Sequence, residues 1–352
     1  MNLDPHMDDT QCEQLASELK SNPFAFKHLD LRGNSVKQSG AELLFAALES
    51  PKCKLRTLRL RDCVLSERSW ASLASALKVN PSYLRELDLS GNKYLTESGV
   101  KLLSDGLKEL AGCELTESSC ASLVSGLESS CYFLKELDLS GNCLQDSGVK
   151  LLCAGLKSKH CSLEILRLVG CELTESSCAS LVSGLESSRY SLTELDLSGN
   201  CLQDSGVKLL CAGFKHQYLF FTTLRLSSCS LSEKSCESLV SALDRTVSIL
   251  KVLDLSLNQL WDSGIKVLSA GLRSPHCKLK TLRLKQCLFS DEGCASLVSA
   301  LKSNPYDLTE LDLSGNKLRT EGMNLLSEFV KSPHCNTANS EPQLRTKNML
   351  SE

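Results

Sequence analysis

One short phrase recurs at a constant spacing, and this repeat constrains the fold of the chain more than any other feature. The phrase is Leu-x-Leu-x-x followed by Asn or Cys, as in "LDLRGN" and "LRLRDC". Its last residue, called the anchor below, alternates strictly at Asn34, Cys63, Asn92, Cys113, Asn142, Cys171, Asn200, Cys229, Asn258, Cys287 and Asn316. Successive anchors lie 29 residues apart, except that Asn92 and Cys113 are separated by 21. A fixed period of this length indicates a solenoid of stacked units.

Each period predicts one short strand followed by one helix. The Leu-x-Leu segment has the two-residue alternation of a half-buried strand, and segments such as "LTESSCASLVSGL" carry apolar residues at helical spacing with a Ser or Asp near the start as a possible N-cap. Strands that alternate with helices must be parallel. Parallel strands lie about 4.8 Å apart whereas packed helices need about 10 Å, so the stack has to curve. We therefore expect an α/β leucine-rich-repeat horseshoe of about eleven repeats over residues 1–335, with strands on the concave face and helices on the convex face.

The anchors are predicted to be structural. An inward-facing Asn can satisfy backbone groups of the adjoining turns, and Cys can fill the same position as a small hydrophobic residue. A second cysteine column follows seven residues later, on the helices, at Cys120, Cys178, Cys236 and Cys294. Metal or redox chemistry is the alternative, but repeated columns more often reflect packing than ligation. We expect no metal site and no cofactor.

Composition restricts the compartment and the kind of partner. The formal net charge is -3, which gives no reason to expect nucleic acid or an anionic membrane as partner. No apolar run reaches the length of a membrane span, and the acidic start "MNLDPHMDDTQ" does not resemble a secretory signal. The 19 cysteines are odd in number and include no C-x-x-C pair. A reduced, cytoplasmic chain is the prediction.

The wording of the repeats resembles one receptor family. Phrases such as "SPHCKLKTLRL" and "CASLVSALKSNPYDLTELDLSGN" are similar to the ribonuclease-inhibitor-like repeats of fish NACHT–LRR (NOD-like) receptors, over about residues 8–335. The resemblance implies a cytosolic protein-interaction or sensing module of innate immunity and not an enzyme. The chain has no G-x-x-x-x-G-K-[ST] loop, so nucleotide binding is not expected here. The PRY/SPRY domain of some relatives is also absent, and residues 336–352 are predicted to form a disordered tail.

One repeat is shorter than the others. The segment "GLKELAGCELTESSC", residues 106–120, lacks nine residues that are present in the corresponding segment 155–178. The missing residues include the return loop and the first strand leucine, so Lys108 falls where a buried Leu belongs. We predict that the fourth strand, near 106–113, is short or displaced, and that the array consists of two regular blocks, 8–107 and 113–335.

Side chains that alternate with the strand leucines should face the open side of the sheet. The column between the leucines, called the ladder below, reads Asp30, Arg59, Asp88, Glu109, Asp138, Arg167, Asp196, Arg225, Asp254, Arg283 and Asp312. Apart from Glu109 it alternates acid and base, so each Arg is predicted to lie between two Asp. We interpret it as a self-neutralising ladder in preference to a charged binding surface.

The columns on either side of the ladder supply the candidate protein contacts. They are Arg32, Arg61, Val169 and Lys285 in the following column, and Glu86, Glu136, Glu194 and Glu310 in the preceding column. An ordinary solvated sheet surface is the alternative interpretation.

Catalysis has little support in the sequence. Three histidines, His160, His276 and His334, precede a Cys at the same repeat position. Adjacent residues on an extended loop point apart, and no third orienting group recurs. Three hypotheses remain: a protein-binding segment of a receptor of the NOD-like type, an enzyme regulator similar to ribonuclease inhibitor, or a truncated receptor fragment with no independent role. The second requires a strongly acidic concave face for a cationic nuclease, which the alternating ladder does not favour.

Overall fold

The structure is a computed structural model that describes fifteen segments of the chain. These are residues 7, 9–21, 26–34, 36–50, 53–79, 86–92, 95, 110–130, 135–157, 163–186, 192–213, 221–243, 249–303, 308–331 and 343–345. The chain divides into two compact units. Unit 1 comprises Met1–Cys171 with Ser187–Arg189, and unit 2 comprises Glu172–Glu186 with Tyr190–Glu352.

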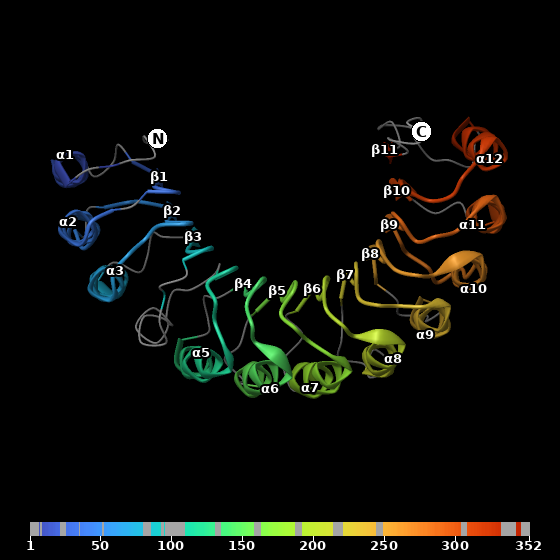
Figure 1. The fold of residues 1–352 in the computed structure, drawn as a ribbon, viewed down its shortest axis with the longest axis horizontal. Helices are drawn as coiled ribbons and strands as arrows, with labels where there is room; N and C mark the ends of the chain where they lie inside the picture. Colours follow the sequence, from blue (N-terminus) through green and yellow to red (C-terminus); the bar gives the residue numbers. More distant parts are fainter. Residues whose placement is uncertain are drawn as a thin grey trace. The chain divides into compact units, whose positions relative to one another are not determined.

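Strands and helices alternate along both units (Figure 1). Unit 1 contains α1 (Asp9–Ser21), β1 (His28–Asp30), α2 (Gln38–Leu48), β2 (Thr57–Arg59), α3 (Glu67–Val79), β3 (Glu86–Asp88), α5 (Glu117–Ser130), β4 (Glu136–Asp138), α6 (Gln145–Leu156) and β5 (Ile165–Arg167). Unit 2 contains α7 (Glu175–Glu186), β6 (Glu194–Asp196), α8 (Gln203–Gly213), β7 (Thr223–Arg225), α9 (Glu233–Leu243), β8 (Val252–Asp254), α10 (Trp261–Leu272), β9 (Thr281–Arg283), α11 (Asp291–Ser303), β10 (Glu310–Asp312), α12 (Thr320–Lys331) and β11 (Gln343–Arg345).

The strands pair in parallel, with the repeat leucines in register. Leu29 pairs with Leu58 in unit 1, and Leu253 pairs with Leu282 in unit 2. Each of these leucines is buried, and so is the second leucine of each strand phrase. Within each unit the strands lie on the inner side of the stack and the helices on the outer side (Figure 1). The predicted α/β leucine-rich-repeat solenoid is therefore confirmed.

The space between strands and helices is filled by the second cysteine column and by helix residues with helical spacing. Cys178, Cys236 and Cys294 are fully buried. In the second repeat Trp70 occupies this column and is also fully buried, which shows that the position serves packing and accepts side chains of different size.

Helix starts are capped in two different ways, and only one of them follows the prediction. In Cys-type repeats a hydroxyl of the same repeat caps the helix, since Ser66 Oγ accepts from Ser69 N and Thr174 Oγ1 accepts from Ser176 N, both at 3.3 Å. In Asn-type repeats the predicted cap is wrong, because α6 and α10 have no side-chain cap. Their Asp instead caps the following helix: Asp262 Oδ1 accepts from Ser290 N at 2.7 Å and from Gly293 N at 2.8 Å. Capping therefore connects neighbouring repeats.

The short repeat keeps its turn. The strand positions of this repeat, residues 107–109, lie outside the described residues, so the short or displaced fourth strand stays a prediction. The backbone still bonds to both neighbours, since Gly91 N donates to Ala111 O at 2.6 Å and Leu110 N donates to Asp138 O at 2.7 Å. Among the described strands, β3 is the last of one run of paired strands and β4 is the first of the next. Lys108 and Glu109 lie outside the described residues, and the two compact units divide near Cys171 and not at this repeat.

Part of the C-terminal segment differs from the prediction. Residues 336–352 were expected to be disordered, yet Gln343–Arg345 form β11, which pairs in parallel with β10. Leu344 pairs with Leu311, so β11 continues the leucine register of unit 2. The remainder of 336–352 lies outside the described residues. Across the segments that the structure covers, no helix is long and apolar enough to cross a membrane.

Candidate functional site

The asparagine anchors bind backbone groups of two adjacent repeats. Asn258 Nδ2 donates to Leu226 O and to Leu255 O, both at 2.8 Å. Its Oδ1 accepts from Cys229 N at 3.0 Å and from Leu231 N at 3.1 Å. The side chain is 2% exposed, so these backbone groups have no access to bulk water and depend on the amide.

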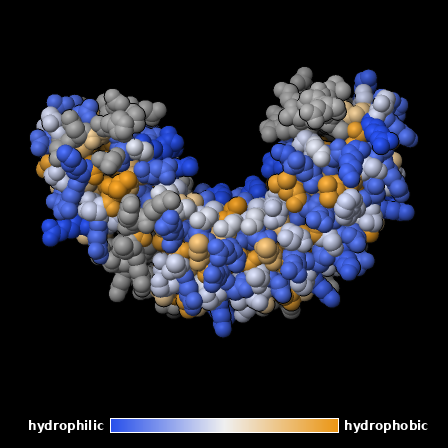
Figure 2. Space-filling model, in the orientation of Figure 1, coloured by the Kyte–Doolittle hydropathy of each residue, from blue (hydrophilic) through white to orange (hydrophobic). Residues whose placement is uncertain are grey.

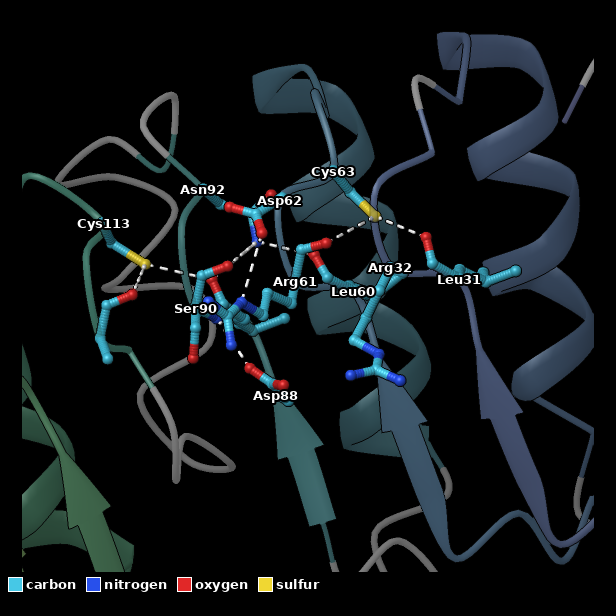
Figure 3. Close-up of polar contacts among 12 residues, drawn as sticks. Leu31, Arg32, Leu60, Arg61, Asp62, Cys63, Asp88, Ser90, Asn92 and Cys113 are labelled. Carbon is cyan, nitrogen blue, oxygen red and sulfur yellow. Dashed lines mark hydrogen bonds and ion pairs between the residues drawn. The ribbon is translucent and has the colours of Figure 1, made fainter. Parts of the chain in front are cut away.

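The cysteine anchors act only as donors, and the closest acceptor is a carbonyl of the preceding repeat. Cys229 Sγ lies 3.2 Å from Leu197 O, and Cys63 Sγ lies 3.0 Å from Leu31 O. Figure 3 shows Cys63, Asn92 and Cys113 directed at main-chain carbonyl groups of the preceding repeats. A thiol must be protonated to donate, and burial raises the pKa of Cys63 to about 11 and that of Cys229 to about 12.

These contacts explain why the anchors alternate. Asn has both a donor and an acceptor, and its acceptor binds backward to the N–H groups that follow the preceding Cys anchor. Cys offers only the donor. Each Cys-type repeat and the next Asn-type repeat thus form a bonded pair, as for Leu115 N with Asn142 Oδ1 at 2.9 Å. Asn92 is the exception, because its buried Oδ1 has no partner and Leu65 N bonds to Cys63 O instead.

Ligand chemistry at the cysteines finds no support in the structure. The cysteines that the structure describes are free thiols, and all but Cys143 and Cys201 are buried. Burial raises the pKa to about 11 or 12 for Cys63, Cys113, Cys120, Cys153, Cys171, Cys229, Cys236, Cys287 and Cys294. Such thiols stay protonated at neutral pH and are poor nucleophiles. No group of three His, Cys, Asp or Glu side chains within the described segments could hold a metal ion.

The Asp residues of the ladder fix the turn that follows each strand. Asp138 Oδ1 accepts from Ser140 N at 3.0 Å, and Asp254 Oδ1 accepts from Ser256 N at 2.9 Å. The serine hydroxyl then accepts from the next repeat, as Ser140 Oγ does from Val169 N at 3.1 Å. The Asp and Ser of the Asp-Leu-Ser phrase therefore stabilise the turn after each strand, in addition to forming part of the strand face.

The Arg residues of the ladder pair mainly with Glu and less closely with Asp. Arg225 Nη1 lies 2.7 Å from Glu194 Oε1, and Arg283 forms two hydrogen bonds to Glu310, at 2.9 and 3.2 Å. The contact between Arg283 and Asp254 is longer, at 3.9 Å. The prediction that each Arg pairs with the Asp on both sides is therefore only partly correct. The short Asp side chains bind their own turns, and the longer Glu side chains reach the guanidinium groups instead.

The candidate contact residues fall into two groups. Glu136, Glu194 and Glu310 are ion-paired to Arg167, Arg225 and Arg283. Among the basic candidates, Arg32 is bound to Asp30 at 2.8 Å, and this hydrogen bond lowers the pKa of the Asp30 carboxyl. Arg61 has a longer contact, 3.2 Å to Asp62, and its side chain is 57% exposed (Figure 3).

The remaining candidates are in different environments. Val169 is half-buried, Lys285 is exposed, and Glu86 lies in β3 with its side chain outside the description. The structure therefore leaves Arg61 and Lys285 as the candidates that are most open to a partner, one in each unit. The Glu–Arg pairs were not foreseen, although the Glu in the column before the ladder in alternate repeats is the signal that could have revealed them.

Comparisons with known proteins agree with this architecture. A family model described as "Leucine Rich repeat" matches residues 80–104, 130–153, 191–211, 249–269 and 307–327. The chain is 45% identical over 97 residues to "NACHT, LRR and PYD domains-containing protein 12" of Mus musculus, covering 28% of this chain and 9% of that protein. It is 38% identical over 99 residues to "Ribonuclease inhibitor" of Sus scrofa, covering 28% of this chain and 21% of that protein.

A solved structure has the same fold at low sequence identity. The leucine-rich repeat-containing protein LegL7 from Legionella pneumophila is 17% identical and has a TM-score of 0.50, covering 86% of this chain and 97% of that one. The matched segments span about a tenth of the NACHT relative and about a fifth of the ribonuclease inhibitor. The repeats of this chain thus form a leucine-rich-repeat region related to those of NACHT, LRR and PYD domain proteins and of ribonuclease inhibitor.

Proposed function

We propose that this chain is a non-enzymatic protein-binding module, the sensing or scaffold segment of an innate immune protein of the NOD-like-receptor type that acts in the cytoplasm. The observation that carries the proposal is a hydrogen-bonded scaffold whose strand face presents polar side chains, most of them half-buried. The anchors bind the backbone internally, while Arg61 and Lys285 extend from that face into solvent. A surface held in this way presents side chains with little loss of backbone entropy on binding.

The segments related to NACHT, LRR and PYD domain proteins support the receptor assignment. The partner is proposed to be a protein, with no nucleic acid, membrane or nucleotide bound by this chain. The modest net charge of -3 and the internal pairing of Glu136, Glu194 and Glu310 are consistent with recognition that does not depend on long-range electrostatic steering.

The test uses purified folded chain as bait in a cytosolic extract, followed by reconstitution with the purified candidate partner. We expect a stoichiometric complex that the double variant Arg61→Glu, Lys285→Glu weakens at least about tenfold, since reversed charge at an interface acts against the matched partner. The matched control is Lys157→Glu, because Lys157 directly follows helix α6 and lies away from the strand face. A reconstituted complex that tolerates the double variant, or the absence of any stoichiometric complex, would contradict the proposal.

A second candidate function is inhibition of a ribonuclease, and the 38% identity to "Ribonuclease inhibitor" is the observation that favours it. The ion pairs of the strand face oppose it, since the Glu side chains that could attract a cationic enzyme already bind Arg225 and Arg283. An activity assay with pancreatic-type ribonuclease separates the two functions. Inhibition at nanomolar concentration that weakens with salt would replace the first proposal.

A further inference from the structure

A group of apolar side chains lies where this fold ordinarily places glycine or polar residues. The turn after each strand needs a positive φ, and Gly fills that position in most repeats, as at Gly141 and Gly199. Leu257 occupies it in the repeat of β8, with φ of 60° and 49% exposure. Left-handed backbone is unfavourable for a residue with a Cβ, and most of all for bulky ones.

At two further positive-φ positions nearby, an apolar residue also replaces the polar residue found in other repeats. The first residue of α10 is Trp261 with φ of 54°, where α6 and α8 begin with Gln145 and Gln203 at φ of 55°. Leu288 follows the anchor Cys287 with φ of 65°, where Glu114 and Glu172 stand in other repeats. Among the non-glycine residues with positive φ in the described segments, these three alone are apolar.

The three residues belong to one edge of unit 2. Trp261 N donates to Cys287 O at 3.1 Å, which places Trp261 beside Leu288. Leu257 N donates to Lys285 O at 2.7 Å, three residues before Leu288. Figure 2 shows hydrophobic residues at the surface of this part of the molecule, near β8 and β9. We call Leu257, Trp261 and Leu288 the apolar edge.

Basic side chains surround the apolar edge. Lys317 Nζ lies 5.3 Å from the centre of the Trp261 ring, a cation–π contact, and Lys285 is exposed next to Leu257. One acid of α10 is engaged inward, since Asp262 accepts from Ser290 N and Ser290 Oγ, at 2.7 and 2.9 Å. Lys317 and Lys285 therefore supply positive charge beside Trp261 and Leu257.

We propose that the apolar edge is the docking site for an acidic peptide segment of a partner protein, in which Leu or aromatic side chains alternate with Asp or Glu. Trp261 and Leu257 would receive the apolar side chains, and Lys317 and Lys285 would meet the carboxylates. Trp is one of the residue types enriched at interface hot spots. Backbone strain that persists at an exposed Leu is itself a pointer to function. This inference rests on the proposed protein-binding function and assigns it a second surface, which adjoins the strand face at Lys285.

The equivalent positions of other repeats provide the substitutions for testing the apolar edge. Leu257→Gly and Trp261→Gln install the residues that other repeats carry at the same backbone conformation, so both variants should fold, and Leu257→Gly should unfold at an equal or higher denaturant concentration. Val64→Ser is the matched control, because Val64 is 54% exposed and occupies in unit 1 the repeat position that Leu288 occupies in unit 2. Lys317→Glu tests the charge.

The experiment selects phage-displayed random peptides of about 12 residues on the full chain and measures the affinity of the enriched peptides by fluorescence anisotropy. We expect peptides that combine acidic and apolar residues. Trp261→Gln should weaken them about 30-fold and Leu257→Gly and Lys317→Glu about tenfold each, whereas Val64→Ser should change affinity less than about twofold. The chain has two Trp, and Trp70 is fully buried, so quenching of tryptophan emission by acrylamide reports protection of Trp261 directly.

Other outcomes would overturn the inference. Enriched peptides that are basic or uncharged, or that bind Trp261→Gln as well as the unaltered chain, would exclude the acidic-peptide site. Self-association of the chain that Trp261→Gln abolishes would assign the apolar edge to a second copy. If Arg61→Glu abolishes peptide binding while Trp261→Gln and Lys317→Glu retain it, the peptides bind at the strand face and the acidic-peptide site is excluded. If neither peptides nor a cytosolic partner bind, both proposals fail.

Discussion

Replacing Asn258 by Ala removes the most completely bonded anchor contact described in unit 2. The side chain serves four buried backbone groups: Leu226 O, Leu255 O, Cys229 N and Leu231 N. At about 1 kcal/mol for each hydrogen bond, Asn258→Ala should lower the free energy of unfolding by about 4 kcal/mol. Asn258→Cys restores a donor to Leu226 O but no acceptor, so it should cost about 3 kcal/mol.

Asn92 provides the control at the same repeat position. Its Nδ2 donates to Leu60 O and Leu89 O at 2.8 and 2.6 Å, but its Oδ1 has no partner. Substitution by Cys should therefore cost about 2 kcal/mol less at Asn92 than at Asn258, because the two acceptor bonds of Asn258 are missing there.

The assay combines urea unfolding, followed by far-UV circular dichroism, with hydrogen exchange read by mass spectrometry. Exchange is needed because a repeat array can unfold locally, and it assigns the loss to the repeats around each anchor. Equal losses for Asn92→Cys and Asn258→Cys would refute the reasoning, since the acceptor bonds would then contribute nothing. A loss below about 1 kcal/mol for Asn258→Ala would refute the whole account of the anchors.

Three further predictions follow from the buried thiols and the strand face. Because the nine thiols named above titrate near 11 or 12 when folded and near 9.0 when free, the unfolded chain loses protons first. Urea stability should fall between about pH 9 and about pH 11, by up to about 1.4 kcal/mol per pH unit for each thiol, with a shallower slope in Cys236→Ala. Brief labelling with iodoacetamide should modify Cys143 and Cys201 well before the other described cysteines, and fast labelling of Cys171 or Cys229 in folded protein would count against their burial. A double-mutant cycle on Glu194→Gln and Arg225→Gln should give a coupling of about 1 kcal/mol that weakens with salt, and zero coupling would show that this ion pair only maintains solubility.

The short repeat shows what a sequence pattern can and cannot predict. The comparison of "GLKELAGC" with its full-length counterpart revealed the missing residues and predicted a short or displaced fourth strand. The strand positions 107–109 lie outside the described residues, but the turn that follows them keeps the hydrogen bonds Gly91 N to Ala111 O and Leu110 N to Asp138 O, which join it to the repeats on either side. Local pattern matching identifies missing residues, but it cannot show whether the turn that remains still bonds to its neighbours.

Helix capping and the C-terminal segment illustrate the same limit. Asp262 stands at the start of its own helix, where a sequence reading places an N-cap, but its carboxylate binds the N-terminus of the next helix, 28 residues further along. Gln343–Arg345 carry a single leucine in a polar segment, and they form a strand because β10 offers them an open edge. In both cases the partner comes from another repeat, so no local rule could have identified it.

The sequence by itself determined the repeat, the parallel α/β solenoid and the buried leucines, whereas members of the alternating columns such as Asp88, Asp196 and Thr223 are buried. A period of 29 residues with fixed apolar positions leaves one way to bury every repeat, which is to stack it on the next. Only the tertiary structure decided which groups across that stack meet. It paired Arg225 with Glu194 in preference to Asp, directed Asn258 back to the turn after Cys229, and left Leu257 and Trp261 exposed on positive-φ backbone. The physical reason is that these contacts depend on the length of each side chain and on the backbone conformation of the neighbouring repeat. The spacing of residues along the sequence does not specify either.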